Sequence, residues 1–443
     1  MTDSVIYGHL WGTPEIRGIF EDEARVQSWL DILAALAAAQ AEVGLVPAEA
    51  ARLIAEHADA NLLDLNEVAA QTRATGHSTL GLIRCLRTLL PEPAREWVYY
   101  GATVQDVTDT WTALVIRDVM SIVDRDLARA EAAATDLARR HRDTIMSGRT
   151  HGQPGLPITF GFKAAVWAAE LRRHRARLAE GRTRWEVAQL GGALGTMEFW
   201  GDAALPLLAA FARRVGLAAP ELPWLTARDG IAEFVTLLAL ATSTLAKVGQ
   251  EVYQLQRPEI GELAEPFTPG QVGSITMPHK RNPELSEHLV TLARLVRADA
   301  MVAVEGVITE HERDGRGWKT EWAVLPEACL YTGVALNMAC RLLEGLEADP
   351  ERMRQNLLAG GGYVLSEPVM RALAEKVGKH TAHEVVYEAT LAGRQRGVDL
   401  RTALLADPRI TAALKTEEID RCLDPSAALG AAGSFVDRIV DAR

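Results

Sequence analysis

One apolar seam constrains the fold of this chain more than any other feature. Between Ile231 and Arg257, apolar residues recur at alternating spacings of four and three, and Gly249 is the only glycine in the stretch: Phe234, Leu238, Ala241, Leu245, Val248, Val252 and Leu255. This spacing places the apolar side chains on one stripe of a helix, which packs against neighbouring helices. The seam therefore predicts a long helix that stops at Pro258.

Three further segments have helical periodicity. They run from Thr108 to Arg142, from Phe162 to about Gln189, and onward from Pro283. Alternating patterns typical of strands are nearly absent. We therefore expect an all-α chain with a central bundle of long helices. Bundles with such seams usually form oligomers, because a monomer would leave apolar stripes exposed.

Glycine-rich breaks suggest three helical domains. We expect an N-terminal domain over 1–101, a long-helix domain over 102–357 and a small C-terminal domain over 358–443, with Gly360 to Gly362 near the second boundary. Loops are expected at 147–154, 189–196 and 259–283. Long loops in a compact helical protein are usually functional.

Composition excludes several classes of function. The 443 residues carry 47 Lys and Arg against 59 Asp and Glu, a formal charge of −12, which disfavours nucleic-acid and anionic-membrane partners. The four cysteines form no C-x-x-C pair, and the N-terminus has no basic stretch followed by an apolar run. Both features favour the cytoplasm. No metal site is expected, since His380 and His383 lack a third ligand.

The long loop contains the densest set of reactive side chains. Residues 270–283 read Gly-Gln-Val-Gly-Ser-Ile-Thr-Met-Pro-His-Lys-Arg-Asn-Pro and place Ser274, Lys280 and Asn282 within a few residues. One interpretation is a solvated loop that caps the next helix at Asn282. The alternative is a carboxylate-binding loop, because a basic cluster stands out in an acidic protein.

Three motifs carry a resemblance to a known family. The segment Gly273-Ser-Ile-Thr-Met-Pro-His-Lys-Arg-Asn-Pro283 is similar to the signature loop of the fumarase/aspartase superfamily. Tyr100 to Asp109 and Gly148 to Gly161 resemble two other regions of that family, in the expected order. The resemblance covers essentially the whole chain. It lies nearest to the adenylosuccinate lyase and 3-carboxy-cis,cis-muconate cycloisomerase branch.

The resemblance implies roles for five residues. Ser274 would take a proton from the carbon beside a carboxylate, and backbone N–H groups and cations would stabilise its alkoxide. Lys280 and Asn282 would hold the substrate carboxylate and its dianionic form. His151 would protonate the leaving group, with Glu287 orienting the ring and raising its pKa. No cofactor is implied.

Further substrate contacts are implied at positions that match less securely. They are Thr103, Gln105, Thr150, Gln189, Arg313 and His77. The chain also departs from its relatives. Ile275 stands where a second loop serine is usual, Val104 replaces a serine, and Trp318 and Trp322 occupy positions that hold a nucleotide phosphate in adenylosuccinate lyases. Adenylosuccinate is therefore disfavoured as the substrate.

The expected activity is a cofactor-free β-elimination, or the reverse addition, on a di- or tricarboxylate of the succinyl type. The bond broken would be C–N or C–O. The pattern is closest to the cycloisomerases, and the alternative is a C–N lyase that releases fumarate from an N-substituted aspartate. An inactive structural relative is a third, remote possibility. The resemblance implies a homotetramer whose active sites combine residues from several subunits.

Overall fold

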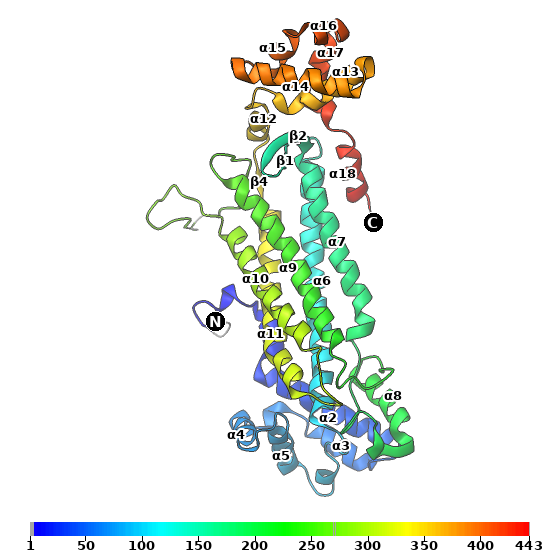
Figure 1. Cartoon of the computed structure of the whole chain (residues 1–443). Coiled ribbons are helices and arrows are strands. Elements are labelled where there is room, and N and C mark those ends of the chain that lie inside the picture. The colour runs from blue at the N-terminus through cyan, green and yellow to red at the C-terminus, as the bar shows by residue number, and fades with distance from the viewer. Residues whose placement is uncertain (1–3, 269, 271, 443) are drawn as a thin grey trace. The chain divides into compact units, whose positions relative to one another are not determined.

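The computed structural model describes residues 4–268, 270 and 272–442 (Figure 1). Helices make up 69% of the structure and strands 4%, so the predicted all-α class is confirmed. The chain divides into two compact units, each built from alternating segments. Unit 1 comprises Met1–Asp126, His174–Ser243 and Thr291–Asn337, and unit 2 comprises Leu127–Arg173, Thr244–Val290 and Met338–Arg443.

Five long helices dominate the structure. They are α6 (Val104–Arg140), α7 (Phe160–Trp185), α9 (Asp229–Gln256), α10 (Glu284–Glu305) and α11 (Gly315–Glu344). The four long helices predicted from periodicity are present, and α11 is additional. Every residue of the predicted α9 seam is buried, with Phe234, Leu238 and Val252 fully so. The alternating spacing therefore identified the buried stripe of α9 correctly.

Short helices complete unit 1. They are α1 (Pro14–Phe20), α2 (Asp22–Glu42), α3 (Ala48–Glu56), α4 (Leu65–Thr75), α5 (Leu80–Leu89) and α8 (Ala204–Val215). α2 packs against α3 and α8, and α4 packs against α5. Helix starts follow local capping rules. Thr13 caps α1 and Asp64 caps α4, because each side chain accepts a hydrogen bond from a free N–H of the first turn.

Unit 2 contains a β-hairpin that the sequence did not reveal. β1 (Ile145–Thr150) pairs antiparallel with β2 (Gln153–Thr159), with Met146 opposite Ile158. The prediction of a loop over 147–154 was therefore wrong. The segment contains no Asn-Gly or Asp-Gly turn signal, and its prolines disfavour strands. Pro154 and Pro157 are tolerated because a two-stranded hairpin has only edge strands, whose outward N–H groups need no partner.

The C-terminal part of unit 2 has a hydrophobic core of its own. Its helices are α12 (Pro350–Leu358), α13 (Ser366–Val377), α14 (Lys379–Arg396), α15 (Leu400–Leu405), α16 (Pro408–Ala413), α17 (Thr416–Cys422) and α18 (Ala432–Val440). Buried side chains of α13 to α17 form one cluster that includes Val369, Leu404 and Ile419. A short pair of strands, β3 (Leu263–Ala264) and β4 (Glu347–Ala348), lies within unit 2. The three-domain division stays a prediction.

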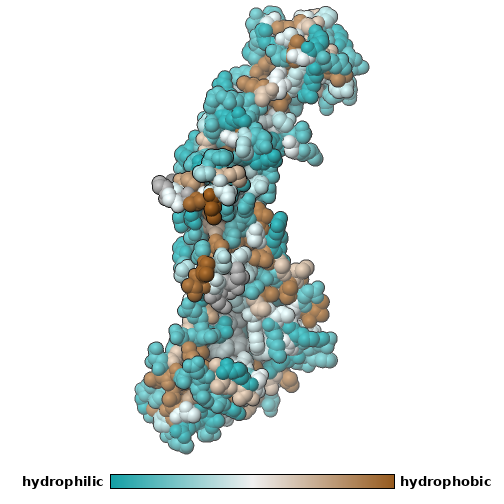
Figure 2. Space-filling model, turned by 90° about the vertical axis from the view of Figure 1, so that its left-hand side faces the viewer, coloured by the Kyte–Doolittle hydropathy of each residue, from teal (hydrophilic) through white to brown (hydrophobic). Residues whose placement is uncertain are grey.

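Among the residues that the structure describes, two helices are long and apolar enough to cross a membrane, α9 and α11. In each, most of the apolar window is buried, 61% in α9 and 72% in α11, as in the core helices of water-soluble proteins. By contrast, α10 presents apolar side chains to solvent: Met301, Val302 and Val304, followed by Val307 and Ile308 just beyond its end. Figure 2 shows brown apolar groups interrupting an otherwise hydrophilic face.

Candidate active site

Both ends of the long loop in unit 2 are anchored by a buried carboxylate. Glu265 is 6% exposed, and its carboxylate accepts hydrogen bonds from the backbone N–H groups of Leu285 (3.0 Å) and Ser286 (2.7 Å). It thereby caps the first turn of α10, which has free N–H groups and the positive end of the helix dipole. The guanidinium of Arg281 donates to the Glu265 carbonyl at 3.1 Å. The sequence had suggested Asn282 for this capping role.

The loop folds back on itself around Ser274. The backbone N–H of Met277 donates to Ser274 Oγ at 3.2 Å, and that of Lys280 donates to the Met277 carbonyl at 2.9 Å. A Cβ on Gly273 would come within 2.4 Å of the Lys280 carbonyl oxygen. Only glycine fits there, so the Ser274 and Lys280 ends of the turn lie against each other. An N–H donor at Ser274 Oγ stabilises negative charge on that oxygen.

His151 lies at the tip of the β1–β2 hairpin. Thr150 pairs with Gln153, leaving His151 and Gly152 as a two-residue turn in which φ is +52° and +74°. Positive φ at both central residues is the type I′ geometry that suits hairpin twist. Histidine rarely adopts it, and the backbone strain presents the exposed imidazole on a fixed corner. Thr150 is also exposed.

A buried ion pair fixes that corner. Arg149 of β1 donates both Nη atoms to the carboxylate of Glu262, at 2.8 and 2.6 Å, and Glu262 is fully buried. Asn356 of α12 donates to the same carboxylate at 2.9 Å. Because Glu262 leads into the long loop, one carboxylate connects the His151 hairpin, the Ser274 loop and α12. Such bidentate contacts are strong and directional.

The remaining predicted residues of unit 2 surround this frame. Lys280 is exposed, Asn282 is half-buried, and Glu287 is exposed in the first turn of α10. Within the described part of the chain, His151 has no hydrogen-bond or ion-pair partner. The predicted pair of His151 with Glu287 is therefore not formed inside this single chain.

In unit 1, Asp106 organises a second group of predicted residues. It is 1% exposed, and its carboxylate accepts from the backbone N–H groups of Thr103 (2.9 Å), Gly191 (2.7 Å) and Gly192 (3.1 Å). Burial raises the pKa of Asp106 to about 6, and the N–H donors oppose that shift. Asp106 thus caps α6 and holds the glycine-rich loop beside it.

The two predicted glutamines of unit 1 have structural hydrogen bonds. Gln189 is fully buried; it donates to Asp106 at 3.2 Å and accepts from the backbone N–H of Trp224 at 2.6 Å. Gln105 is 1% exposed and donates to the Leu225 carbonyl at 2.7 Å. Both side chains position the loops around the N-terminus of α6.

Arg313 joins these loops at the surface. Its guanidinium donates to Thr103 Oγ1 at 2.8 Å and to the carbonyls of Gly192 and Ala193 at 3.3 and 3.0 Å. Thr103, Gln189 and Arg313 are therefore brought together around Asp106. His77, also in unit 1, is exposed after Gly76 ends α4 in the left-handed conformation.

A buried charge cluster lies under this group. The guanidinium of Arg228, 1% exposed, contacts the carboxylates of Asp109 and Glu321, and Trp318 donates to Asp109 at 3.1 Å. Trp318 is therefore a core residue, whereas Trp322 is 43% exposed. The two tryptophans that replace phosphate-binding residues of adenylosuccinate lyases thus have different environments.

Sequence reasoning missed the buried acids that organise both groups. Asp106 had a usable signal, because Thr103-x-x-Asp106 is the spacing of a capping box. Glu262 and Glu265 had none beyond their place in the loop, since their partners lie 113 and 20 residues away. Only the folded chain brings these groups together.

Comparison with known proteins identifies the family. A lyase family model matches residues 11–297, and a model of the adenylosuccinate lyase C-terminus matches residues 362–439. The chain is 38% identical to an N-acetyl-S-(2-succino)cysteine lyase of Dickeya dadantii, over 99% of this chain and 97% of that protein. It is 41% identical to a 3-carboxy-cis,cis-muconate cycloisomerase of Pseudomonas aeruginosa, over 96% and 93%.

Solved structures agree with this assignment. The 3-carboxy-cis,cis-muconate lactonizing enzyme of Pseudomonas putida superimposes with a TM-score of 0.91 at 36% identity, covering 99% of this chain and 98% of that chain. A fumarate lyase of Mesorhizobium sp. BNC1 gives 0.92 at 34% identity, covering 98% and 99%. The chain is a lyase of the fumarase/aspartase superfamily, in its adenylosuccinate lyase and cycloisomerase branch.

Proposed function

We propose that this lyase eliminates a heteroatom leaving group from a succinyl adduct and releases fumarate, or runs the reverse addition. The observation that carries the proposal is the folded loop of unit 2. It places Ser274 Oγ on a backbone N–H donor and packs its neighbour Gly273 against the backbone carbonyl of Lys280. A hydroxyl can act as a base only where its anion is stabilised, and this turn provides a backbone N–H donor at Ser274 Oγ on the same loop that carries Lys280.

The reaction follows from these groups. Ser274, as the alkoxide, takes the proton from the carbon next to the substrate carboxylate, and Lys280 and Asn282 stabilise the resulting dianion. The bond to the leaving atom then breaks, the electron pair stays on that atom, and His151 supplies its proton. An alkene dicarboxylate and the protonated leaving group result. Ser274 and His151 afterwards exchange one proton each with solvent, which restores the starting state.

We also propose a homotetramer with shared active sites. His151, Thr150, Lys280, Glu287 and Arg313 are all exposed in one chain, although elimination chemistry needs a site that excludes water. The exposed apolar residues of α10 and the segment after it provide a surface that a second copy would cover. Glu287 of one subunit would then orient His151 of another. We also propose a cytoplasmic location, because the four cysteines are all free, as in a reducing compartment.

A specific comparison favours a second candidate. The chain is 41% identical to a cycloisomerase, and a lactonizing enzyme shares the fold over nearly its whole length. Ring closure of a carboxymuconate uses the same proton and carboxylate chemistry in the addition direction. The two candidates differ in the nucleophile that adds to the alkene. In the fumarate-releasing lyase it is a separate molecule, and in the cycloisomerase it is a carboxylate of the substrate itself.

Incubation with fumarate and a panel of amines, thiols and alcohols tests the proposal. We expect a new succinyl adduct by mass spectrometry, lost in Ser274→Ala and retained in the control Thr276→Val, which removes an exposed hydroxyl from the same loop. Failure of every nucleophile together with turnover of carboxymuconate would establish the second candidate. Unchanged turnover in Ser274→Ala would refute the assignment of the base.

A further inference from the structure

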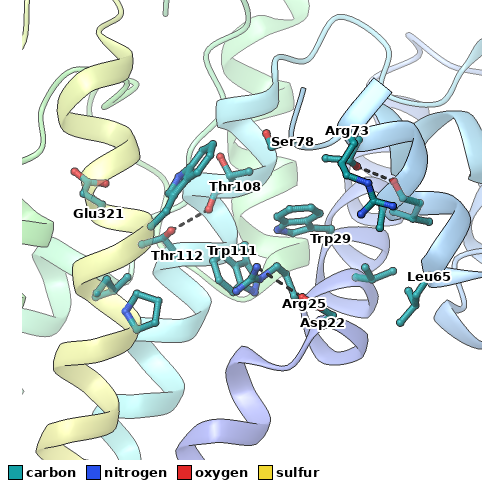
Figure 3. A pocket seen from close by; sticks show the side chains of 17 residues that line it. Asp22, Arg25, Trp29, Leu65, Arg73, Ser78, Thr108, Trp111, Thr112 and Glu321 are labelled. Atoms are coloured by element: carbon teal, nitrogen blue, oxygen red, sulfur yellow. Dashed lines mark hydrogen bonds and ion pairs between the residues drawn. The ribbon is translucent and has the colours of Figure 1, made fainter. Parts of the chain in front are cut away.

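Unit 1 contains a pocket of about 400 Å³ between α2, α4, α6 and α11. This volume lies in the usual range for small-molecule sites. Figure 3 shows the side chains that line it, with Trp29 and Trp111 near its centre. The residues discussed above as candidates for catalysis do not line this pocket, so it has no assigned role so far.

Three indoles form the apolar wall of the pocket. Trp29 and Trp111 meet edge to face, with ring centroids 6.2 Å apart, and Trp322 lines the α11 side. Trp322 in turn packs edge to face on Trp318 at 4.7 Å. Rigid indole faces bind flat apolar groups at low cost in conformational entropy. The wall therefore selects a planar apolar ligand.

Two arginines give the pocket a positive charge. The Arg25 guanidinium lies over the Trp111 ring at 4.9 Å, and burial lowers its pKa. Its nearest carboxylate, Asp22, is 3.9 Å away and 86% exposed, so the compensation is weak. Arg73 also lines the pocket and has no ion-pair partner among the described residues.

The other lining acid does not cancel this charge. Glu321 is 5% exposed and shares Arg228 with Asp109, and burial raises the pKa of Glu321, which favours its neutral form. In a chain with a formal charge of −12, two weakly compensated arginines beside an apolar wall are a local exception. A ligand carboxylate would restore the balance, because a desolvated guanidinium gains most from a charge-assisted hydrogen bond.

The pocket adjoins the group of candidate residues in unit 1. It is lined by Ser78, the residue after His77, and by Thr108, one turn after Val104 on α6. Glu321 connects it to the cluster of Arg228 and Asp109 below the Asp106 loops. The pocket and the Thr103 group therefore share the first turns of α6.

We propose that this pocket binds the leaving group of the substrate, and that the leaving group is a planar aromatic carboxylate whose amino, hydroxyl or thiol group carries the bond to the succinyl carbon. The inference rests on the proposed function, because it assigns the part of the adduct beyond the fumarate carbons. The indoles hold the ring, and Arg25 and Arg73 hold its carboxylate. Specificity among succinyl adducts then depends on this wall.

Calorimetric binding of 2-naphthoate to the whole enzyme tests the pocket without turnover. We expect 2-naphthoate to bind at least tenfold more tightly than neutral 2-naphthamide, in wild type and in inactive Ser274→Ala alike. Trp322→Leu and Arg73→Gln should each weaken binding at least fivefold. The controls Tyr387→Leu and Arg396→Gln change exposed residues of unit 2 and should leave binding unchanged.

Equal affinity for the acid and the amide would overturn the role of the arginines. Binding unaffected by Trp322→Leu, in a protein with unchanged thermal unfolding, would overturn the site. Arg73→Gln is preferred to Arg25→Gln, because Arg73 is exposed and its loss leaves the packing on Trp111 intact. Lyase activity without 2-naphthoate binding would refute this inference alone. Binding without lyase activity would refute the proposed function, and with it the leaving-group role, while the aromatic carboxylate site itself would stand.

Discussion

Replacing Glu262 by Gln tests whether the buried ion pair holds the His151 hairpin. Gln keeps the shape of the side chain and removes its charge. One of the two Arg149 contacts, at 2.8 and 2.6 Å, would then face an amide N–H₂ instead of an oxygen. The Asn356 donor at 2.9 Å would compete for the single remaining acceptor. Both effects loosen the connection between β1 and the start of the long loop.

The magnitude follows from the burial of the pair. Removing one partner of a buried ion pair typically costs about 3–5 kcal/mol. The Glu262 side chain is fully buried but that of Arg149 is 20% exposed, so water partly stabilises the unpaired guanidinium. We therefore expect about 3 kcal/mol, at the lower end of the range. Because about 1.4 kcal/mol corresponds to tenfold, local opening of the hairpin should increase roughly 100-fold.

Amide hydrogen exchange measures this opening directly. The amides of β1 should lose protection in Glu262→Gln, and those in the middle of α9 should not. Glu259→Gln is the matched control, because Glu259 lies in the same loop with a 69% exposed side chain and only a 3.5 Å contact to Arg257. It should leave exchange of β1 within error.

The coupling between the two partners gives the decisive result. In a double-mutant cycle of Arg149→Gln and Glu262→Gln, the second substitution should cost far less than the first. A coupling energy below about 0.5 kcal/mol, or unchanged exchange of β1 in Glu262→Gln, would refute the argument that this carboxylate fixes the hairpin.

Three further substitutions test other parts of the frame. Glu265→Gln leaves one acceptor for two N–H groups of α10, so we expect a loss of about 1–2 kcal/mol in chemical unfolding, and no loss would contradict the cap. Burial raises the pKa of Asp106 to about 6, so the stability that its protonated form contributes is complete below about pH 4 and is lost as the pH rises through 6. In thermal melts, wild type should therefore lose stability relative to Asp106→Asn between about pH 4 and pH 6. Parallel stability curves of the two proteins would contradict this prediction. Arg313→Lys keeps the charge but cannot make three contacts with Thr103, Gly192 and Ala193, so KM should rise at least tenfold at an unchanged melting temperature, and an unchanged KM would remove Arg313 from substrate binding.

The long helices were predictable because their signal is periodic and local. The α9 seam fixed a helix to within two residues at its N-terminus and one at its C-terminus. The hairpin was not predictable for the opposite reason. Its turn depends on positive φ at His151, which histidine rarely adopts, and on a buried partner 113 residues away. Periodicity carries no information about either condition.

The candidate residues divide in the same way. Motif resemblance selected Ser274, Lys280 and His151 as candidates, and the structure adds the N–H donor at Ser274 and the turn at His151. Motif resemblance could not show that Gln105 and Gln189 are buried among loops, since their hydrogen-bond partners are 120 and 35 residues away. The sequence also could not distinguish the environments of Trp318 and Trp322, which lie one helical turn apart on α11. Trp318 donates to a buried carboxylate, and Trp322 lines a pocket.

A common design connects these findings. Asp106, Glu262 and Glu265 are buried acids that bind backbone N–H or guanidinium groups, and each supports a segment whose exposed residues are candidates for chemistry. An exposed side chain contributes little packing, so its position depends on such supports. A change in Glu262 or Glu265 should therefore lower kcat without altering the shape of the pH–rate profile. A change in His151 or Ser274 should alter the profile itself, because the titrating group is lost.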